Sequence, residues 1–165
     1  MTLIYNKNLG VTKPSTHAIV IGVGIYDHLP GGKGKLCRSH DGMGQLSSPP
    51  YSAMEFANWL INEYNNPEYP LNTLDLLISA GPAININIPG ITQTIFESAK
   101  MEEIKRAIRA WKERGDENEE NIMVFYFCGH GIASGLLLSL LPQDYGKDPN
   151  AVFEAAIDFN KFYLG

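Results

Sequence analysis

The chain has 165 residues, of which 44% are hydrophobic and 19% charged, the size and composition of one globular domain. A formal net charge of −5 and the lack of a Lys- and Arg-rich stripe argue against a nucleic-acid-binding surface. No apolar segment approaches the roughly 18 residues needed to span a membrane, and the N-terminal residues lack the pattern of a signal peptide. The two cysteines, Cys37 and Cys128, do not suggest a disulfide framework. We therefore expect a cytoplasmic protein with no nucleic-acid or membrane partner.

The first half of the chain predicts a strand, a long loop, a helix and a second strand. The β-branched run over residues 16–24 ends at glycines and is typical of a strand buried on both faces. Residues 26–50 are rich in Gly, Pro and Ser and predict a loop of a length that is usually functional or disordered. An amphipathic helix over residues 51–64 and a strand over residues 72–79 follow.

The second half repeats the alternation. Prolines interrupt a second loop over residues 80–96. Apolar residues at helical spacing then predict another amphipathic helix: Met101, Ile104, Ala107, Ile108 and Trp111. Gly115 is its expected C-cap, and strands are predicted over residues 121–127 and 136–141. This order predicts an α/β fold with a mostly parallel sheet flanked by helices.

The third predicted strand ends at a histidine between two glycines, His130. In parallel sheets, ligands and catalytic groups gather beyond the carboxyl ends of the strands, where both long loops also begin. Gly129 and Gly131 permit close backbone approach and unusual dihedral angles, and the N–H of Gly131 is free to bind an oxyanion. This placement favours a functional histidine over a polar residue in a tight turn.

Other motifs fit known sites less well. The segment GVGIYD has Asp27 where a dinucleotide-binding motif needs glycine, and GGKGKL lacks the spacing of a phosphate loop. Cys37, His40, Cys128 and His130 are zinc-ligand types, but their spacing differs from that of structural zinc sites, so we expect no metal. Alternate residues of a strand are roughly 6.5 Å apart, which separates Cys128 from His130 as a nucleophile and base. We expect Cys128 to be a buried structural cysteine and Cys37 a loop thiol.

Four segments together resemble the caspase-like cysteine peptidases, especially their bacterial, metacaspase-related branch: HAIVIGVGIYDHLPGG, LSSPPYSAMEFANWL, IKRAIRAWKERG and NIMVFYFCGHG. The segments LLPQDYG and AAIDFNKFYLG fit those that follow in bacterial members. On this resemblance, residues 16–165 form a caspase-like peptidase domain and residues 1–15 an N-terminal extension. The resemblance implies a three-layer fold in which the catalytic histidine follows the third strand of a mostly parallel sheet and the cysteine follows the fourth.

The resemblance also implies a reaction and a role for each residue. His130 would be the base of a Cys–His dyad that hydrolyses peptide bonds in protein or peptide substrates, without a cofactor, and Gly131 would contribute to the oxyanion hole. Relatives of this kind suggest a role in bacterial stress or antiviral defence. No cysteine occurs among residues 131–165. We therefore expect a domain truncated before the strand that carries the nucleophile. This His-bearing fragment would be inactive alone, until a downstream segment or a partner chain supplies the cysteine.

Two other functions remain open. One is a non-catalytic caspase-like module that binds a protein partner, and the other is an unrelated α/β domain that binds a small ligand at the carboxyl edge of the sheet. The first long loop predicts neither an acidic nor a basic substrate preference, because its charges have both signs: Asp27, Lys33, Lys35, Arg38 and Asp41.

Overall fold

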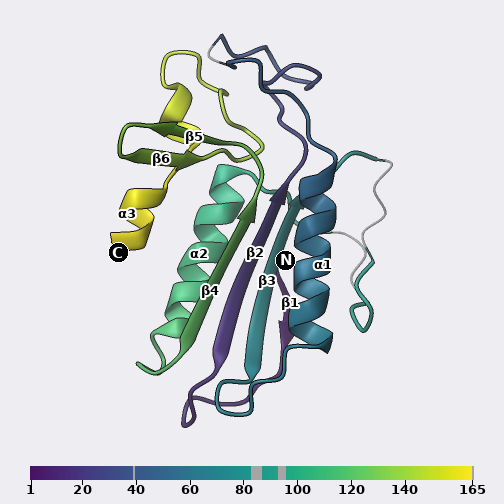
Figure 1. Cartoon of the computed structure of the whole chain (residues 1–165), viewed down its shortest axis with the longest axis vertical. Helices are drawn as coiled ribbons and strands as arrows, with labels where there is room; N and C mark the ends of the chain where they lie inside the picture. Colours follow the sequence, from purple (N-terminus) through teal and green to yellow (C-terminus); the bar gives the residue numbers. More distant parts are fainter. Residues whose placement is uncertain (39, 83–86, 93–95, 165) are drawn as a thin grey trace.

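The computed structural model describes residues 1–38, 40–82, 87–92 and 96–164, and it has a mixed α/β fold (Figure 1). The main sheet contains four strands: β1 (Leu3–Asn6), β2 (Thr16–Val23), β3 (Leu71–Ser79) and β4 (Ile122–Cys128). Their spatial order is β1-β3-β2-β4. Strands β2, β3 and β4 are parallel, and β1 is antiparallel to β3. The prediction of a mostly parallel sheet is confirmed at this level.

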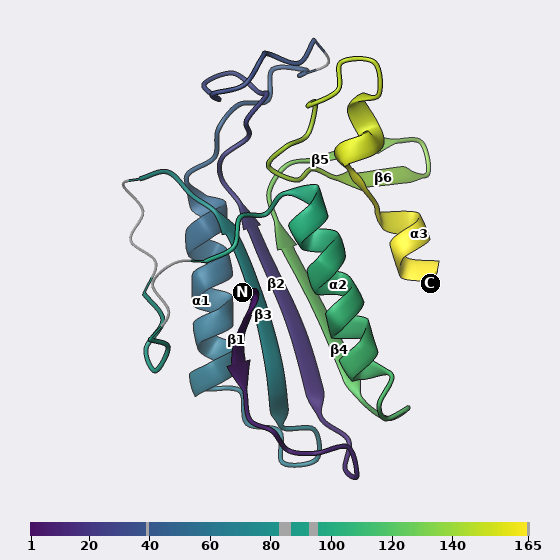
Figure 2. The same cartoon turned by 180° about the vertical axis from the view of Figure 1, so that it is seen from behind.

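The two predicted helices cover opposite faces of this sheet, as Figures 1 and 2 show. Helix α1 (Ser48–Asn62) buries Ala53, Ala57 and Leu60, and helix α2 (Met101–Gly115) buries Ile104, Ala107 and Trp111. Prolines in the first turn of α1 lack only N–H groups that would have no partner within the helix. Helix α1 approaches β2 so closely that a Cβ atom on Gly22 would lie 2.7 Å from the Cβ of Ala53.

Strand β2 contributes side chains to two hydrophobic cores, one on each face of the main sheet. All eight of its residues are buried, as expected from its β-branched run. Ile19 and Ile21 pack with α2, whereas Ala18 and Val20 pack with α1. Fully burying a valine or isoleucine side chain contributes roughly 1.5–3 kcal/mol, so this strand is a principal source of the stability of the fold.

The chain after β4 forms a second, antiparallel sheet. Its strands are β5 (Gly131–Ser134), β6 (Leu137–Leu140) and β7 (Ile157–Asp158), in the order β5-β6-β7. A 3-10 helix, η1 (Val152–Ala155), precedes β7, and α3 (Phe159–Leu164) follows it. The strand predicted over residues 136–141 corresponds to β6, but it pairs with β5 rather than joining the parallel sheet.

Part of the predicted N-terminal extension lies on the main sheet. Strand β1 pairs with β3 within residues 1–15, and the Thr2 hydroxyl donates a hydrogen bond to Asp75. The predicted loop over residues 80–96 includes residues 83–86 and 93–95, which lie outside the described residues. No helix in the described part of the chain has the length and hydrophobicity to cross a bilayer.

Candidate functional site

His130 lies just beyond the carboxyl end of β4, between that strand and β5. Because β2, β3 and β4 are parallel, their carboxyl ends meet at one edge of the sheet. The long loop between β2 and α1, here called the edge loop (residues 24–47, with residue 39 not described), starts at the same edge (Figure 1). The predicted meeting of this loop and His130 is confirmed, because the Gly44 carbonyl contacts the imidazole.

This contact fixes which ring nitrogen of His130 carries the proton. Nε2 lies 2.8 Å from the carbonyl oxygen of Gly44. A carbonyl oxygen only accepts hydrogen bonds, so Nε2 must be the protonated nitrogen. The neutral ring then has its lone pair on Nδ1, to which no described residue bonds. His130 is half-buried, so Nδ1 can act as a proton acceptor at the edge of the sheet.

Tyr26 contacts His130 twice. Its hydroxyl oxygen accepts the backbone N–H of His130 at 2.6 Å, and the two ring centroids are 4.9 Å apart, with the rings inclined by 44°. Tyr26 is fully buried, and burial raises the pKa of its hydroxyl well above the usual range, although the hydrogen bond from His130 opposes this rise. The hydroxyl is therefore protonated at neutral pH.

The Gln45 side chain ties Tyr26 to the rest of the edge loop. Its Oε1 accepts the N–H of Tyr26 at 2.7 Å, and its Nε2 donates to the carbonyls of Tyr26 at 3.0 Å and Pro30 at 2.9 Å. Gly44, whose carbonyl accepts from the imidazole, directly precedes Gln45 in the chain. No local sequence pattern predicted a role for Tyr26, Gly44 or Gln45, because their contacts join distant parts of the chain.

The two glycines beside His130 differ in the space available for a side chain at their positions. A Cβ atom on Gly129 would lie 2.7 Å from the Tyr26 hydroxyl, so the close contact between Tyr26 and the chain requires glycine there. A Cβ on Gly131 would meet its nearest atom, the carbonyl oxygen of Ser139, only at an ordinary 3.4 Å. Neither glycine has a positive φ angle. Close approach, rather than a left-handed backbone, explains the glycine at position 129.

The N–H of Gly131 points away from the β5–β6 hairpin. The two-residue connection after Ser134 makes Ser134 and Leu137 a hydrogen-bonded pair, and hydrogen-bonded pairs alternate along an antiparallel ladder. Gly131 faces Leu140 and therefore belongs to a non-hydrogen-bonded pair. This register directs its N–H away from β6, as binding an oxyanion beside His130 would require.

Among the described contacts of His130, none is to Cys37 or Cys128. Cys128 interacts with the hydroxyl of Tyr126, whose pKa is raised by burial and by the nearby thiol. Cys128 is half-exposed rather than buried as predicted. Cys37 is a thiol of the edge loop, as predicted, but it is only 2% exposed. A Cβ on Gly146 would lie 2.6 Å from the Cβ of Cys37, which explains this burial. Among the described residues, no three His, Cys, Asp or Glu side chains are placed to hold a metal ion.

The five charged residues of the edge loop that could set substrate preference differ in their exposure. Asp27 accepts a hydrogen bond from Gln143 Nε2 at 3.0 Å and lies 3.8 Å from Lys100 Nζ, so it takes part in internal contacts. The four other charged candidates are exposed on the edge loop: Lys33, Lys35, Arg38 and Asp41.

A second polar cluster lies at the amino end of β2, away from His130. The His17 ring contacts Thr73 Oγ1 at 2.8 Å and Ser15 Oγ at 3.2 Å. Arg114 also bonds Thr73 and forms an ion pair with Asp75. Burial, followed by the charge of Arg114, lowers the pKa of His17. Burial raises the pKa of Asp75, and Arg114 and Thr2 oppose this rise.

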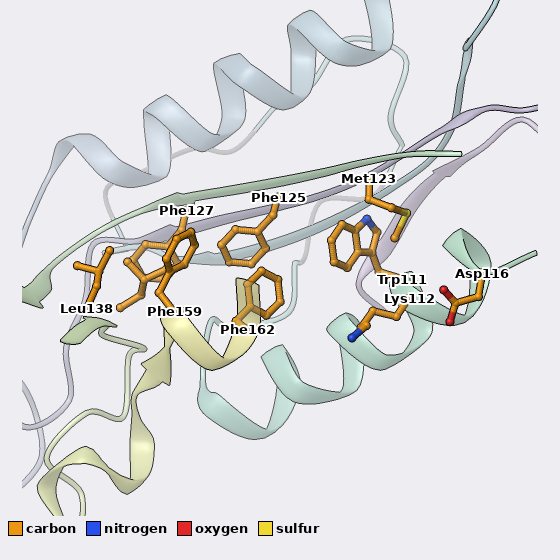
Figure 3. Close-up of a pocket in the computed structure, with 10 residues that line it drawn as sticks. Trp111, Lys112, Asp116, Met123, Phe125, Phe127, Leu138, Phe159 and Phe162 are labelled. Carbon is orange, nitrogen blue, oxygen red and sulfur yellow. The ribbon is translucent and has the colours of Figure 1, made fainter. Parts of the chain in front are cut away.

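A groove of about 730 Å³ lies along the outer edge of β4, on the face toward α2 (Figure 3). It is lined mainly by aromatic and apolar side chains from β4, α2 and α3: Trp111, Met123, Phe125, Phe127, Phe159 and Phe162. Lys112 and Asp116 lie at one end of it, and Leu138 lies at the other. In the part of the chain that the structure describes, β4 pairs with β2 on one side and with no strand on the other.

Comparison with curated proteins finds a distant relative of unassigned function. The chain is 36% identical over 95 residues to an uncharacterized protein, y4kE, of Sinorhizobium fredii. The match covers 55% of this chain and 27% of the relative, so the chain spans about a quarter of the length of the curated relative it matches. No protein-family model and no solved structure matches the chain.

Proposed function

We propose that this chain is the histidine-bearing part of a caspase-like cysteine endopeptidase in which His130 is the general base. One observation carries the proposal: the Gly44 carbonyl holds Nε2 of His130, so that Nδ1 can accept a proton beyond the carboxyl end of a parallel strand. The order of strands and helices and the GHG sequence fit the same family. A role in bacterial stress or antiviral defence belongs to this proposal.

In a thiol-peptidase mechanism, this chain would supply the base and an oxyanion-binding N–H, and another segment would supply the nucleophile. Nδ1 of His130 would take the proton of a cysteine thiol, and the thiolate would form a bond to the carbonyl carbon of the scissile peptide. The N–H of Gly131 would bind the resulting oxyanion. When the C–N bond breaks, the imidazolium returns its proton to the leaving amine, and His130 then activates water to hydrolyse the thioester. The Gly44 carbonyl stabilises the imidazolium by accepting from Nε2–H in each step.

The cysteine must come from polypeptide other than residues 1–165, because Cys128 faces Tyr126 and Cys37 is buried. The outer edge of β4 could bind the polypeptide segment that carries this cysteine. Its backbone groups are available to a further strand, and the groove beside Phe125 and Phe127 could bury that strand's apolar side chains. A strand added there would end beside His130 if it ran parallel to β4.

The test is peptide hydrolysis by the complete gene product. We expect cleavage of a fluorogenic peptide library that iodoacetamide abolishes, with kcat/KM about 10³-fold lower in His130→Ala, as the loss of a general base commonly causes. His40→Ala, in the edge loop, is the matched control and should retain activity. Equal turnover by His130→Ala and the unmodified protein would contradict the proposal.

The outer edge of β4 also favours a second candidate, a non-catalytic module that captures a strand of a protein partner. In this case the complete gene product would cleave no peptide. The outward-facing amides of β4 would become protected against hydrogen exchange only when the partner is added. Protection without the partner, together with peptide cleavage, would reject this candidate.

A further inference from the structure

Three contacts hold the backbone N–H and the imidazole of His130, and two of them come from one side chain. The Tyr26 hydroxyl accepts the His130 N–H, the Tyr26 ring contacts the imidazole, and the Gly44 carbonyl accepts from Nε2. Gln45 binds the backbone of Tyr26 on both its N–H and its carbonyl. The position of the imidazole therefore depends on Tyr26 and on the part of the edge loop that Gln45 ties to it.

The hydroxyl of Tyr26 also changes the backbone hydrogen bonding at His130. The N–H of Leu141 donates to the carbonyl of His130 at 3.0 Å. In a regular antiparallel ladder the N–H of His130 would donate back to Leu141. Instead, this N–H donates to Tyr26 at 2.6 Å, and the ladder begins only at Gly131. The hydroxyl thus sets the orientation of the peptide group between Gly129 and His130.

We propose that Tyr26 is a positioning residue for His130, an inference that rests on the proposed role of His130 as the base. Its hydroxyl holds the backbone N–H while its ring supports the imidazole, so that Nε2 reaches Gly44 and Nδ1 faces the reaction. Without the hydroxyl, the His130 N–H would lose the acceptor that fixes the orientation of this peptide group. The imidazole would then leave Gly44, and the preference for the Nε2–H tautomer would weaken.

The experiment uses ¹⁵N-histidine-labelled protein with Tyr26→Phe, which keeps the ring and removes only the hydroxyl. We expect the imidazole ¹⁵N shifts of His130 to report the Nε2–H tautomer in the unmodified chain and a mixture of tautomers in Tyr26→Phe. We also expect the His130 amide to exchange roughly tenfold faster in the variant, as the loss of one hydrogen bond implies. His130→Gln assigns the signals.

The matched control is Tyr64→Phe, which removes a hydroxyl bonded to Thr16 and Tyr69 at the amino end of β2. It should change neither the tautomer nor the exchange of His130. If Tyr26→Phe leaves both quantities as in Tyr64→Phe, the inference is overturned. Should Tyr26→Phe fail to fold, Gly129→Ala gives the same test, because its Cβ displaces the hydroxyl without removing it.

Kinetics of the complete gene product separate this inference from the proposed function. Tyr26→Phe should lower kcat roughly tenfold at unchanged KM, because a misplaced base slows the chemical step without weakening substrate binding. If no peptide is cleaved by any form of the protein, the proposed function fails, while the tautomer measurement still decides whether Tyr26 positions His130. An unchanged kcat in Tyr26→Phe would contradict the positioning role even in an active peptidase.

Discussion

Strands β2 and β4 run side by side in the same direction, yet they have different environments. Strand β2 pairs with strands on both sides, and all eight of its residues are buried. Strand β4 pairs with β2 alone among the described strands, and none of its residues is fully buried. Strand β2 therefore mainly stabilises the fold, whereas β4 presents His130 and an apolar groove at its outer edge.

The two histidines beside these strands show the same division. His17, at the amino end of β2, is 1% exposed, and both of its ring nitrogens contact hydroxyl groups. His130, beyond the carboxyl end of β4, is half-buried, and only Nε2 has a partner among the described residues. Two residues of the same type therefore have a structural role in one place and a candidate catalytic role in the other.

A matched pair of valine substitutions tests whether the two strands contribute differently to stability. Val20 of β2 and Val124 of β4 both face α1, but only Val20 is fully buried. We expect Val20→Ala to lower the free energy of unfolding by about 2 kcal/mol, because it leaves a cavity in a closed core. Val124→Ala should lower it by less than about 1 kcal/mol. Urea denaturation measures both, and equal losses would show that the two strands stabilise the fold alike.

The pH dependence of stability sharpens the comparison of the histidines. Burial lowers the pKa of folded His17, so between this pKa and the unfolded value of 6.5 the unfolded chain binds more protons. Stability contributed by neutral His17 is therefore fully present above pH 6.5 and decreases as the pH falls toward the folded pKa. The slope from this one group is at most about 1.4 kcal/mol per pH unit.

His17→Gln removes the titrating group but keeps a neutral polar side chain. We expect its free energy of unfolding to fall less than that of the unmodified protein as the pH decreases from 6.5. Thermal unfolding at a series of pH values compares the two proteins. Parallel curves would mean that His17 does not contribute to the loss of stability in acid.

The long elements of the fold were predictable because their signals are local. Apolar periodicity and glycine positions predicted β2, α1, β3, α2 and β4, which form the central sheet and its two faces. Strands β1, β5 and β7 have only four, four and two residues and show no clear periodic pattern, and long-range pairing defines β1 and β7. The predicted N-terminal extension therefore did not reveal that β1 extends the sheet.

The candidate site was predictable only in part. The GHG sequence after an apolar strand indicated His130 and Gly131. Tyr26 and Gly44 contact His130 across 104 and 86 residues of sequence, so no local pattern could reveal them. The reading of Cys37 as a loop thiol missed its burial for the same reason, since its cover includes the distant Gly146.

The proposed role of His130 as a base is tested by searching for a cysteine whose reactivity depends on His130. Iodoacetamide labelling of the complete gene product at neutral pH, followed by peptide mass spectrometry, would compare the unmodified protein with His130→Ala. We expect rapid labelling of a cysteine outside residues 1–165, slowed by roughly tenfold or more in His130→Ala because the thiolate loses its base. Labelling that is equally fast in both proteins, or confined to Cys128, would contradict the assignment of His130 as the base of a cysteine peptidase.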